Sequence, residues 1–139
     1  VDLAKEIVRG GEGVSKVFSV TVKGASSRTQ ARTIARSVTS SNLFKAAVHG
    51  SDPNWGRILC AAGYSGANFD PDRIDVWIGP FKVFGGGIPQ EYSEVDASRY
   101  LDRPESEIVI DLHTGRADAV AWGCDLSKEY VEINAEYTT

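Results

Sequence analysis

The sequence lacks the features of several protein classes. It has no methionine, and only 2 cysteines and 2 histidines among its 139 residues. Its longest apolar runs, Ile58–Ala62 and Ala117–Trp122, are far too short to span a bilayer. The first residues, Val1 to Lys5, lack the basic and apolar regions of a signal peptide. We therefore predict a soluble intracellular protein that does not insert into membranes.

The few cysteines and histidines also argue against a disulfide framework and against a metal site. Cys60 and Cys124 are too isolated to indicate a disulfide framework, and we predict that both are buried as small apolar residues. His49 and His113 belong to no Cys/His cluster and no H-E-x-x-H pattern, so no metal site is expected. The net charge is -4 and no block of Lys and Arg stands out, which argues against a nucleic-acid partner.

The periodicity of apolar residues predicts one mixed domain. A chain of this length with 42% hydrophobic residues can bury a single core. We expect the fold class α+β (mixed α/β), with a mostly antiparallel sheet and packed helices. The expected helices are 2–9, 28–38, 53–62, 93–101 and 127–134, and the expected strands are 16–23, 43–48, 73–78, 81–84, 107–112 and 117–122.

Some of these assignments depend on local signals. Ser27 is the predicted N-cap of the helix 28–38, whose arginines are expected to face solvent. Ser93 and Asp96 occupy capping-box-like positions at the start of the helix 93–101. The run 43–48 favours a buried strand, although a helical turn fits the same pattern. Asp52 is the predicted N-cap of the following helix, with Pro53 at its first position. The strands 107–112 and 117–122 are expected to pair across the turn 113–116. The helix 2–9 begins without a capping signal, as a cut inside a longer helix would.

Two glycine-containing motifs are better explained by turns than by chemistry. Gly63–Ala67 resembles a nucleophile elbow, but it ends in alanine and follows an expected helix instead of a strand. Gly85–Gly87 lacks the Lys and Ser/Thr of a phosphate-binding loop. We predict a loop and a hairpin turn at these positions.

Both ends of the chain carry groups that suit an amino-acid ligand. Glu12 lies among Gly10, Gly11 and Gly13, where the backbone can approach a ligand closely. A carboxylate is also the partner that an ammonium group needs in a partly desolvated site. Asn134 and Thr139 offer donors and acceptors near the terminal carboxylate. The residues alone leave a plain turn and a polar tail as open alternatives.

Three longer blocks carry a family resemblance. They are Ser51–Leu59 with Gly63–Gly66 behind it, Ala121–Leu126 with Tyr130–Val131 and Ile133–Thr139, and Gly11–Lys16. Together they resemble the ornithine acetyltransferase family, also called glutamate N-acetyltransferase, and they span nearly the whole chain. The resemblance implies the C-terminal part of a β chain, with 1–14 as the end of a helix and a Gly-rich substrate loop, and 15–139 as a C-terminal α/β domain.

The resemblance implies an enzyme of arginine biosynthesis that cleaves itself into α and β chains. A threonine at the start of β takes the acetyl group from N2-acetylornithine and passes it to glutamate; some members also use acetyl-CoA as co-substrate, and no other cofactor is expected. Carried over by motif, Glu12, Asn134 and Thr139 bind substrate. Asp52–Arg57 is interpreted as a structural turn and cap, not as part of the site.

The same resemblance implies that the family's nucleophile is not in this sequence. Val1 has no nucleophilic side chain, so no catalytic residue is expected here and the chain alone is expected to be inactive. The implied partners are the α chain and the remainder of the β chain, in a hetero-oligomer located in the cytoplasm, or in the mitochondrial matrix of a fungus. The alternatives are a non-catalytic binding or assembly domain, and a hydrolase of the self-processing aminopeptidase type.

Overall fold

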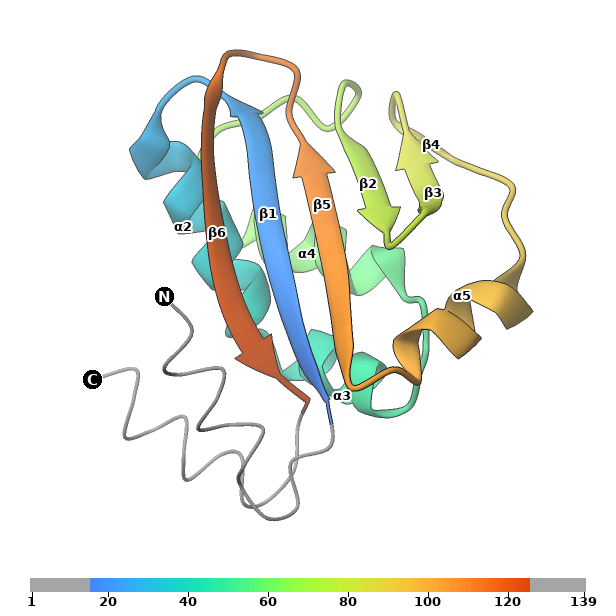
Figure 1. Cartoon of the computed structure of the whole chain (residues 1–139). Helices are drawn as coiled ribbons and strands as arrows, with labels where there is room; N and C mark the ends of the chain where they lie inside the picture. Colours follow the sequence, from blue (N-terminus) through green and yellow to red (C-terminus); the bar gives the residue numbers. More distant parts are fainter. Residues whose placement is uncertain (1–15, 126–139) are drawn as a thin grey trace, which may run out of the picture.

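The computed structural model describes residues 16–125, whose strands form one six-stranded sheet in the order β4-β3-β2-β5-β1-β6 (Figure 1). The strands are β1 (Val17–Ala25), β2 (Asp75–Ile78), β3 (Phe81–Gly85), β4 (Ile88–Pro89), β5 (Glu105–Asp111) and β6 (Ala117–Cys124). The helices are α2 (Arg28–Thr39), α3 (Asn42–His49), α4 (Trp55–Gly63) and α5 (Glu94–Leu101).

The sheet is mostly antiparallel, as predicted. Among the described strands, β1 and β5 form the one parallel pair. The pairs β1–β6, β2–β3, β2–β5 and β3–β4 are antiparallel. The expected α+β class is therefore confirmed.

Helices α2, α3 and α4 cover one face of the sheet, behind the strands in Figure 1. The core lies in this layer, where Phe18, Val20 and Val22 of β1 are fully buried together with Ile34 of α2 and Phe44 of α3. The rings of Phe18 and Phe44 meet edge to face, with centroids 5.2 Å apart. Alternation along β1 follows from this arrangement, because every second side chain points towards the helices.

The capping residues and apolar stripes of α2 and α5 were sufficient to predict both helices correctly. The Ser27 side chain accepts a hydrogen bond from the Gln30 N–H at the start of α2, and Ser93 does the same for Asp96 at the start of α5. The arginines of α2 are exposed, as expected for a solvated helix face. Capping and the apolar stripe agree at both helices, so the local pattern decides the structure.

The predicted strand 43–48 is wrong, because these residues belong to α3. The Ser41 side chain caps the helix by accepting from the Phe44 N–H. Phe44, Ala47 and Val48 are buried while Leu43 is 64% exposed, which is the one-sided burial of a helix. A short apolar run without this cap fits both structures equally well.

The predicted N-cap of the next helix is also wrong, since Asn54 caps α4 and Pro53 precedes it. Asn54 Oδ1 accepts from the Arg57 N–H at 3.1 Å. The Asp52 N–H donates to the Ala47 carbonyl at 2.8 Å, so Asp52 belongs to the end of α3. The segment 52–57 nevertheless acts as the structural turn and cap that the sequence suggested, because Arg57 Nη1 also ties α4 to the Leu43 carbonyl at 2.8 Å.

The expected pairing of the last two strands is wrong, because β1 lies between β5 and β6. Their connection crosses the end of β1 and is held there by the Gly24 carbonyl, which accepts from the N–H groups of Thr114 and Gly115 at 2.8 and 2.9 Å. A turn-like sequence between two strands is compatible with a hairpin or with such a crossing. The pairing of β1 with both β5 and β6 is what produces the crossing connection instead of a hairpin.

Two smaller expectations also differ from the structure. Cys124 is buried as predicted, but Cys60 is exposed. The glycines 85–87 do lie in a hairpin, with positive φ at Gly86 and Gly87, but the short strand β4 that follows them was not predicted. A two-residue strand containing proline carries almost no sequence signal.

Candidate functional site

The predicted substrate residues Glu12, Asn134 and Thr139 lie outside the described residues, as do the predicted helices 2–9 and 127–134. The structure does show where the chain segments that carry them join the domain. Lys16 is the first described residue and Asp125 the last. The geometry around these two residues therefore bears directly on the candidate site.

Lys16 and Asp125 are neighbours at one corner of the sheet. The Asp125 N–H donates to the Lys16 carbonyl at 3.1 Å, and Val17 pairs with Cys124 in the antiparallel register of β1 and β6. Residues that are more than a hundred positions apart in the sequence thus meet in one ladder. The flanks of the two predicted substrate segments are brought together.

The side chain of Lys16 ties this corner to the C-terminal end of α3. Its Nζ donates to the carbonyls of Val48 at 2.9 Å and His49 at 3.2 Å, and to the Ser51 hydroxyl at 2.6 Å. The last carbonyls of a helix have no intrahelical partners and attract cations. Ser51, with φ of 55°, in turn donates to the Asp102 carboxylate.

A histidine–aspartate pair lies at the same corner. His49 Nδ1 is 2.8 Å from Asp125 Oδ2; the Asp125 side chain is 0% exposed and that of His49 is 57% exposed. A carboxylate only accepts hydrogen bonds, so Nδ1 carries the proton in this contact. We call Lys16, His49, Ser51, Asp102 and Asp125 the exit cluster.

Lys45 adds a buried amine from the same helix. It lies one turn before His49 on α3 and is 3% exposed. Burial lowers the pKa of Lys45, and an electrostatic interaction with the nearby Cys124 opposes this shift. Helix α3 therefore meets the end of β6 through two adjacent residues, Cys124 and Asp125.

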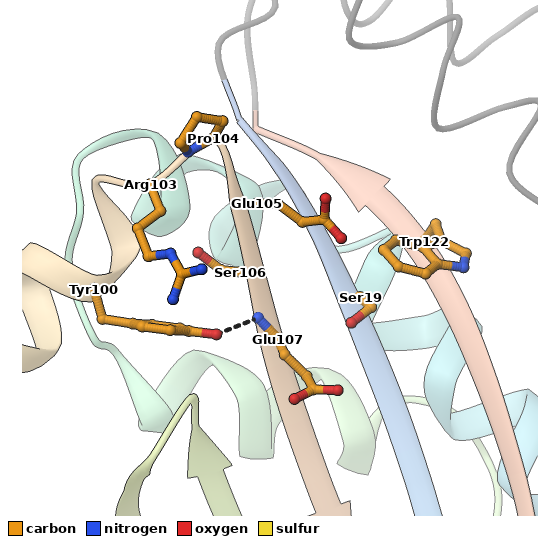
Figure 2. A pocket seen from close by; sticks show the side chains of 8 residues that line it. All are labelled: Ser19, Tyr100, Arg103, Pro104, Glu105, Ser106, Glu107 and Trp122. Carbon is orange, nitrogen blue, oxygen red and sulfur yellow. Dashed lines mark hydrogen bonds between the residues drawn. The ribbon is translucent and has the colours of Figure 1, made fainter.

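A polar pocket of about 620 Å³ opens beside this corner (Figure 2). Its lining residues come from β1, β5, β6 and the end of α5: Ser19, Tyr100, Arg103, Pro104, Glu105, Ser106, Glu107 and Trp122. Ser19 pairs with Glu107 on one side and Trp122 on the other, so three strands contribute one row. The Tyr100 hydroxyl accepts from the Glu107 N–H at 2.9 Å, and Arg103 lies 5.0 Å from the Tyr100 ring centre.

The charges of this pocket suit a cationic group more than an anionic one. The lining includes two carboxylates, from Glu105 and Glu107, and a single guanidinium, from Arg103. Sequence analysis identified none of these residues as part of a site. Glu107 lies on the face of β5 opposite the buried Ile108 and Ile110, and no sequence pattern indicates that Trp122 and Tyr100 line the same pocket.

A second histidine–aspartate pair lies in another part of the sheet. His113 Nε2 is 2.6 Å from Asp75 Oδ2, and Lys82 Nζ is 3.7 Å from the same atom. Burial would raise the pKa of Asp75, but the hydrogen bonds from His113 and the Gly86 N–H, with the charge of Lys82, outweigh it and lower the pKa. The pair joins β2 to the β5–β6 connection and contains no residue of the exit cluster.

Comparison with known proteins gives consistent matches. The model of the ArgJ family matches residues 1–139. The "Arginine biosynthesis bifunctional protein ArgJ" of Symbiobacterium thermophilum is 51% identical over 139 residues, covering 100% of this chain and 35% of the relative. The protein of the same name from Geobacillus kaustophilus is 50% identical over 138 residues, covering 99% of this chain and 34% of the relative.

A solved structure agrees with these relatives. The crystal structure of the arginine biosynthesis bifunctional protein ArgJ from Bacillus halodurans matches with a TM-score of 0.87 and 44% identity, covering 98% of this chain and 64% of that one. The fold and the matches thus define a domain found in enzymes of arginine biosynthesis. The chain belongs to the ArgJ family. It spans about a third of the length of the curated relatives that it matches.

The family resemblance drawn from the sequence motifs is therefore confirmed. Within residues 16–125, no helix is long and apolar enough to cross a membrane.

Proposed function

We propose that this chain is part of an acetyltransferase that moves an acetyl group from N2-acetylornithine to glutamate in arginine biosynthesis. Its role is to supply Glu12, Asn134 and Thr139 to a substrate site, while a threonine on another segment of the same precursor is the nucleophile. The residues 1–14 act as the substrate loop, and 15–139 as the domain that supports it.

The observation that carries this proposal is the hydrogen bond between Asp125 and Lys16, at 3.1 Å. Glu12 is four residues before Lys16, so it lies within about 14 Å of it at full extension. Asn134 is nine residues after Asp125 and lies within about 32 Å. The described residues that flank the two predicted substrate segments are therefore adjacent, and these chain lengths are compatible with a common site near that corner.

The proposed roles follow from the chemistry of the two substrates. N2-acetylornithine has a free side-chain ammonium group for the Glu12 carboxylate, and Asn134 and Thr139 offer hydrogen bonds to the other polar groups of both substrates. The threonine hydroxyl attacks the acetyl carbonyl, and ornithine leaves with the proton. The glutamate amine then attacks the acetyl-threonine ester, which releases N-acetylglutamate and restores the hydroxyl.

The chain would act with the α chain and the remainder of the β chain, in the cytoplasm or, for a fungal source, the mitochondrial matrix. No cofactor is needed for this transfer, and acetyl-CoA would serve only as an additional acetyl donor. A domain with helices on one face and a polar pocket near the exit corner is suited to such an assembly.

The proposal predicts that the full-length protein releases ornithine from N2-acetylornithine rapidly only when glutamate is present. The measurement is ornithine and N-acetylglutamate formed with and without glutamate. Equal amounts of the two products support acetyl transfer. Release of ornithine and acetate at the same rate without glutamate would identify a hydrolase instead, and absence of turnover with both substrates would favour a binding or assembly domain.

A further inference from the structure

We infer that the polar pocket beside β5 is a second ligand site, which binds the charged head group of a free α-amino acid. The inference uses no residue of the proposed acetyl-transfer site. It rests on four groups that line the pocket in Figure 2: the hydroxyls of Ser19 and Tyr100, the Arg103 guanidinium and the Glu107 carboxylate. None of the sequence motifs includes these residues.

The Ser19 hydroxyl is a buried polar group that lacks a partner. Ser19 is 5% exposed, yet no hydrogen-bond partner for its side chain lies within residues 16–125. It lies between Glu107 and Trp122 in the pocket wall, with its hydroxyl on the side of Glu107 (Figure 2). Buried polar groups are normally hydrogen-bonded, because leaving one unpaired costs free energy. A polar ligand in the pocket would supply the missing partner.

Arg103 and Glu107 give the pocket two opposite charges that are not paired with each other. Neither side chain forms an ion pair or a side-chain hydrogen bond within the described part of the chain. A guanidinium binds a carboxylate through two parallel hydrogen bonds, and a carboxylate accepts charge-assisted hydrogen bonds from an ammonium group. The two side chains therefore complement a ligand that carries both a carboxylate and an ammonium group.

Tyr100 holds these two charged groups on one frame. Its hydroxyl accepts from the Glu107 N–H at 2.9 Å, and its ring lies 5.0 Å from the Arg103 guanidinium. The ring also packs directly over Gly79, where an added Cβ would overlap it. Because the hydroxyl only accepts in its bond with Glu107, its own proton is available to a ligand. The site is therefore already formed before a ligand enters it.

These groups orient an α-amino acid in one way. Its carboxylate pairs with Arg103 and accepts from the Tyr100 hydroxyl, while its ammonium group donates to Glu107 and Ser19. Trp122 lines the same pocket, so the side chain of the ligand lies against the indole ring. The cavity of about 620 Å³ is in the size range of small-molecule sites. A simple amine or a simple carboxylate would use only half of these contacts.

The test is hydrogen exchange of the full-length protein with L-leucine or L-lysine, neither of which is a substrate of the proposed transfer. At about ten times the Kd, at least one of them is expected to slow exchange of the peptide 100–107 about fivefold or more. The methyl ester of that amino acid lacks the carboxylate, and its N-acetyl derivative lacks the ammonium group. Neither derivative should slow the exchange.

Variants of the full-length protein locate the binding, measured as Kd by isothermal titration calorimetry. Arg103→Met and Glu107→Gln should each raise the Kd about 10-fold or more, because each removes one charge from the site. Both side chains are exposed, so neither change should unfold the protein. Arg99→Met and Glu91→Gln are the matched controls, since both residues are exposed outside the pocket and should leave the Kd unchanged.

Ser19→Ala separates a ligand contact from a structural role. It should raise the Kd about threefold, because one neutral hydrogen bond to the ligand is lost. It should not lower the free energy of unfolding of the unliganded protein, because this hydroxyl has no partner within residues 16–125. A less stable Ser19→Ala protein with an unchanged Kd would contradict the role of Ser19 in binding.

The outcomes decide this inference independently of acetyl transfer. It is overturned if neither amino acid slows exchange of the peptide 100–107. Equal protection by the methyl ester would also overturn it, because the pocket would then recognise an amine alone. So would equal losses of binding in the pocket variants and their controls. A protein that binds the amino acid but transfers no acetyl group would leave the inference standing while the proposed function fails.

Discussion

Replacing Glu12 by glutamine in the full-length protein is expected to lower kcat/KM for N2-acetylornithine by about 30- to 1,000-fold. The reason is that a substrate ammonium group would be left in a partly desolvated site without its anionic partner, a loss of about 2–4 kcal/mol. Glutamine keeps the size and hydrogen-bonding capacity of the side chain but not its charge. Steady-state kinetics with each substrate varied in turn measure the effect.

Glu91→Gln is the matched control for this prediction. Glu91 is exposed in the loop before α5, and the same chemical change there should alter kcat/KM by less than twofold. If Glu12→Gln behaves like Glu91→Gln, the Gly-Glu-Gly block does not bind the ammonium group. The sequence alternative of a plain turn would then be favoured.

Replacing Phe44 by alanine is expected to lower the free energy of unfolding by about 3–5 kcal/mol. Phe44 is 0% exposed and its ring packs edge to face against Phe18 beneath the sheet. Truncation removes this contact and leaves a cavity that the surrounding side chains cannot fill completely. Denaturant unfolding followed by circular dichroism measures the change.

The neighbouring residue provides the control. Leu43 is 64% exposed on the same helix, so Leu43→Ala should change the free energy of unfolding by no more than about 0.5 kcal/mol. Similar losses for Leu43→Ala and Phe44→Ala would contradict the one-sided burial of α3. The pair of variants therefore also tests the correction of the predicted strand 43–48.

The sequence was sufficient where local signals and tertiary packing agree. Ser27 and Ser93 cap their helices as predicted, and the alternation of Phe18, Val20 and Val22 correctly indicates the buried face of β1. It was insufficient where two structures share one pattern. The run 43–48 needed its cap at Ser41, and the order of β5, β1 and β6 depends on contacts between residues far apart in the sequence.

The candidate site also contains residues that the sequence motifs indicated and residues that only the fold revealed. Motif resemblance singled out Glu12, Asn134 and Thr139, and the family assignment that it implied is confirmed, while the roles of these residues remain predictions. No pattern pointed to the exit cluster, because its residues come from the flanks of β1 and β6 and from the ends of α3 and α5. A lone His49 and a lone Asp125 carry no signal until the fold places them 2.8 Å apart.

The central claim is that this chain contributes substrate-binding residues while the nucleophile lies on another segment. Its most direct test is a denaturing intact-mass measurement of the purified full-length protein after a brief incubation with N2-acetylornithine and no glutamate. We predict one acetyl group on the β polypeptide that contains this sequence, placed by peptide mapping at the threonine with which that polypeptide begins and at no residue of 1–139, and loss of the label when glutamate is added. An acetyl group that maps within residues 1–139 would contradict the account.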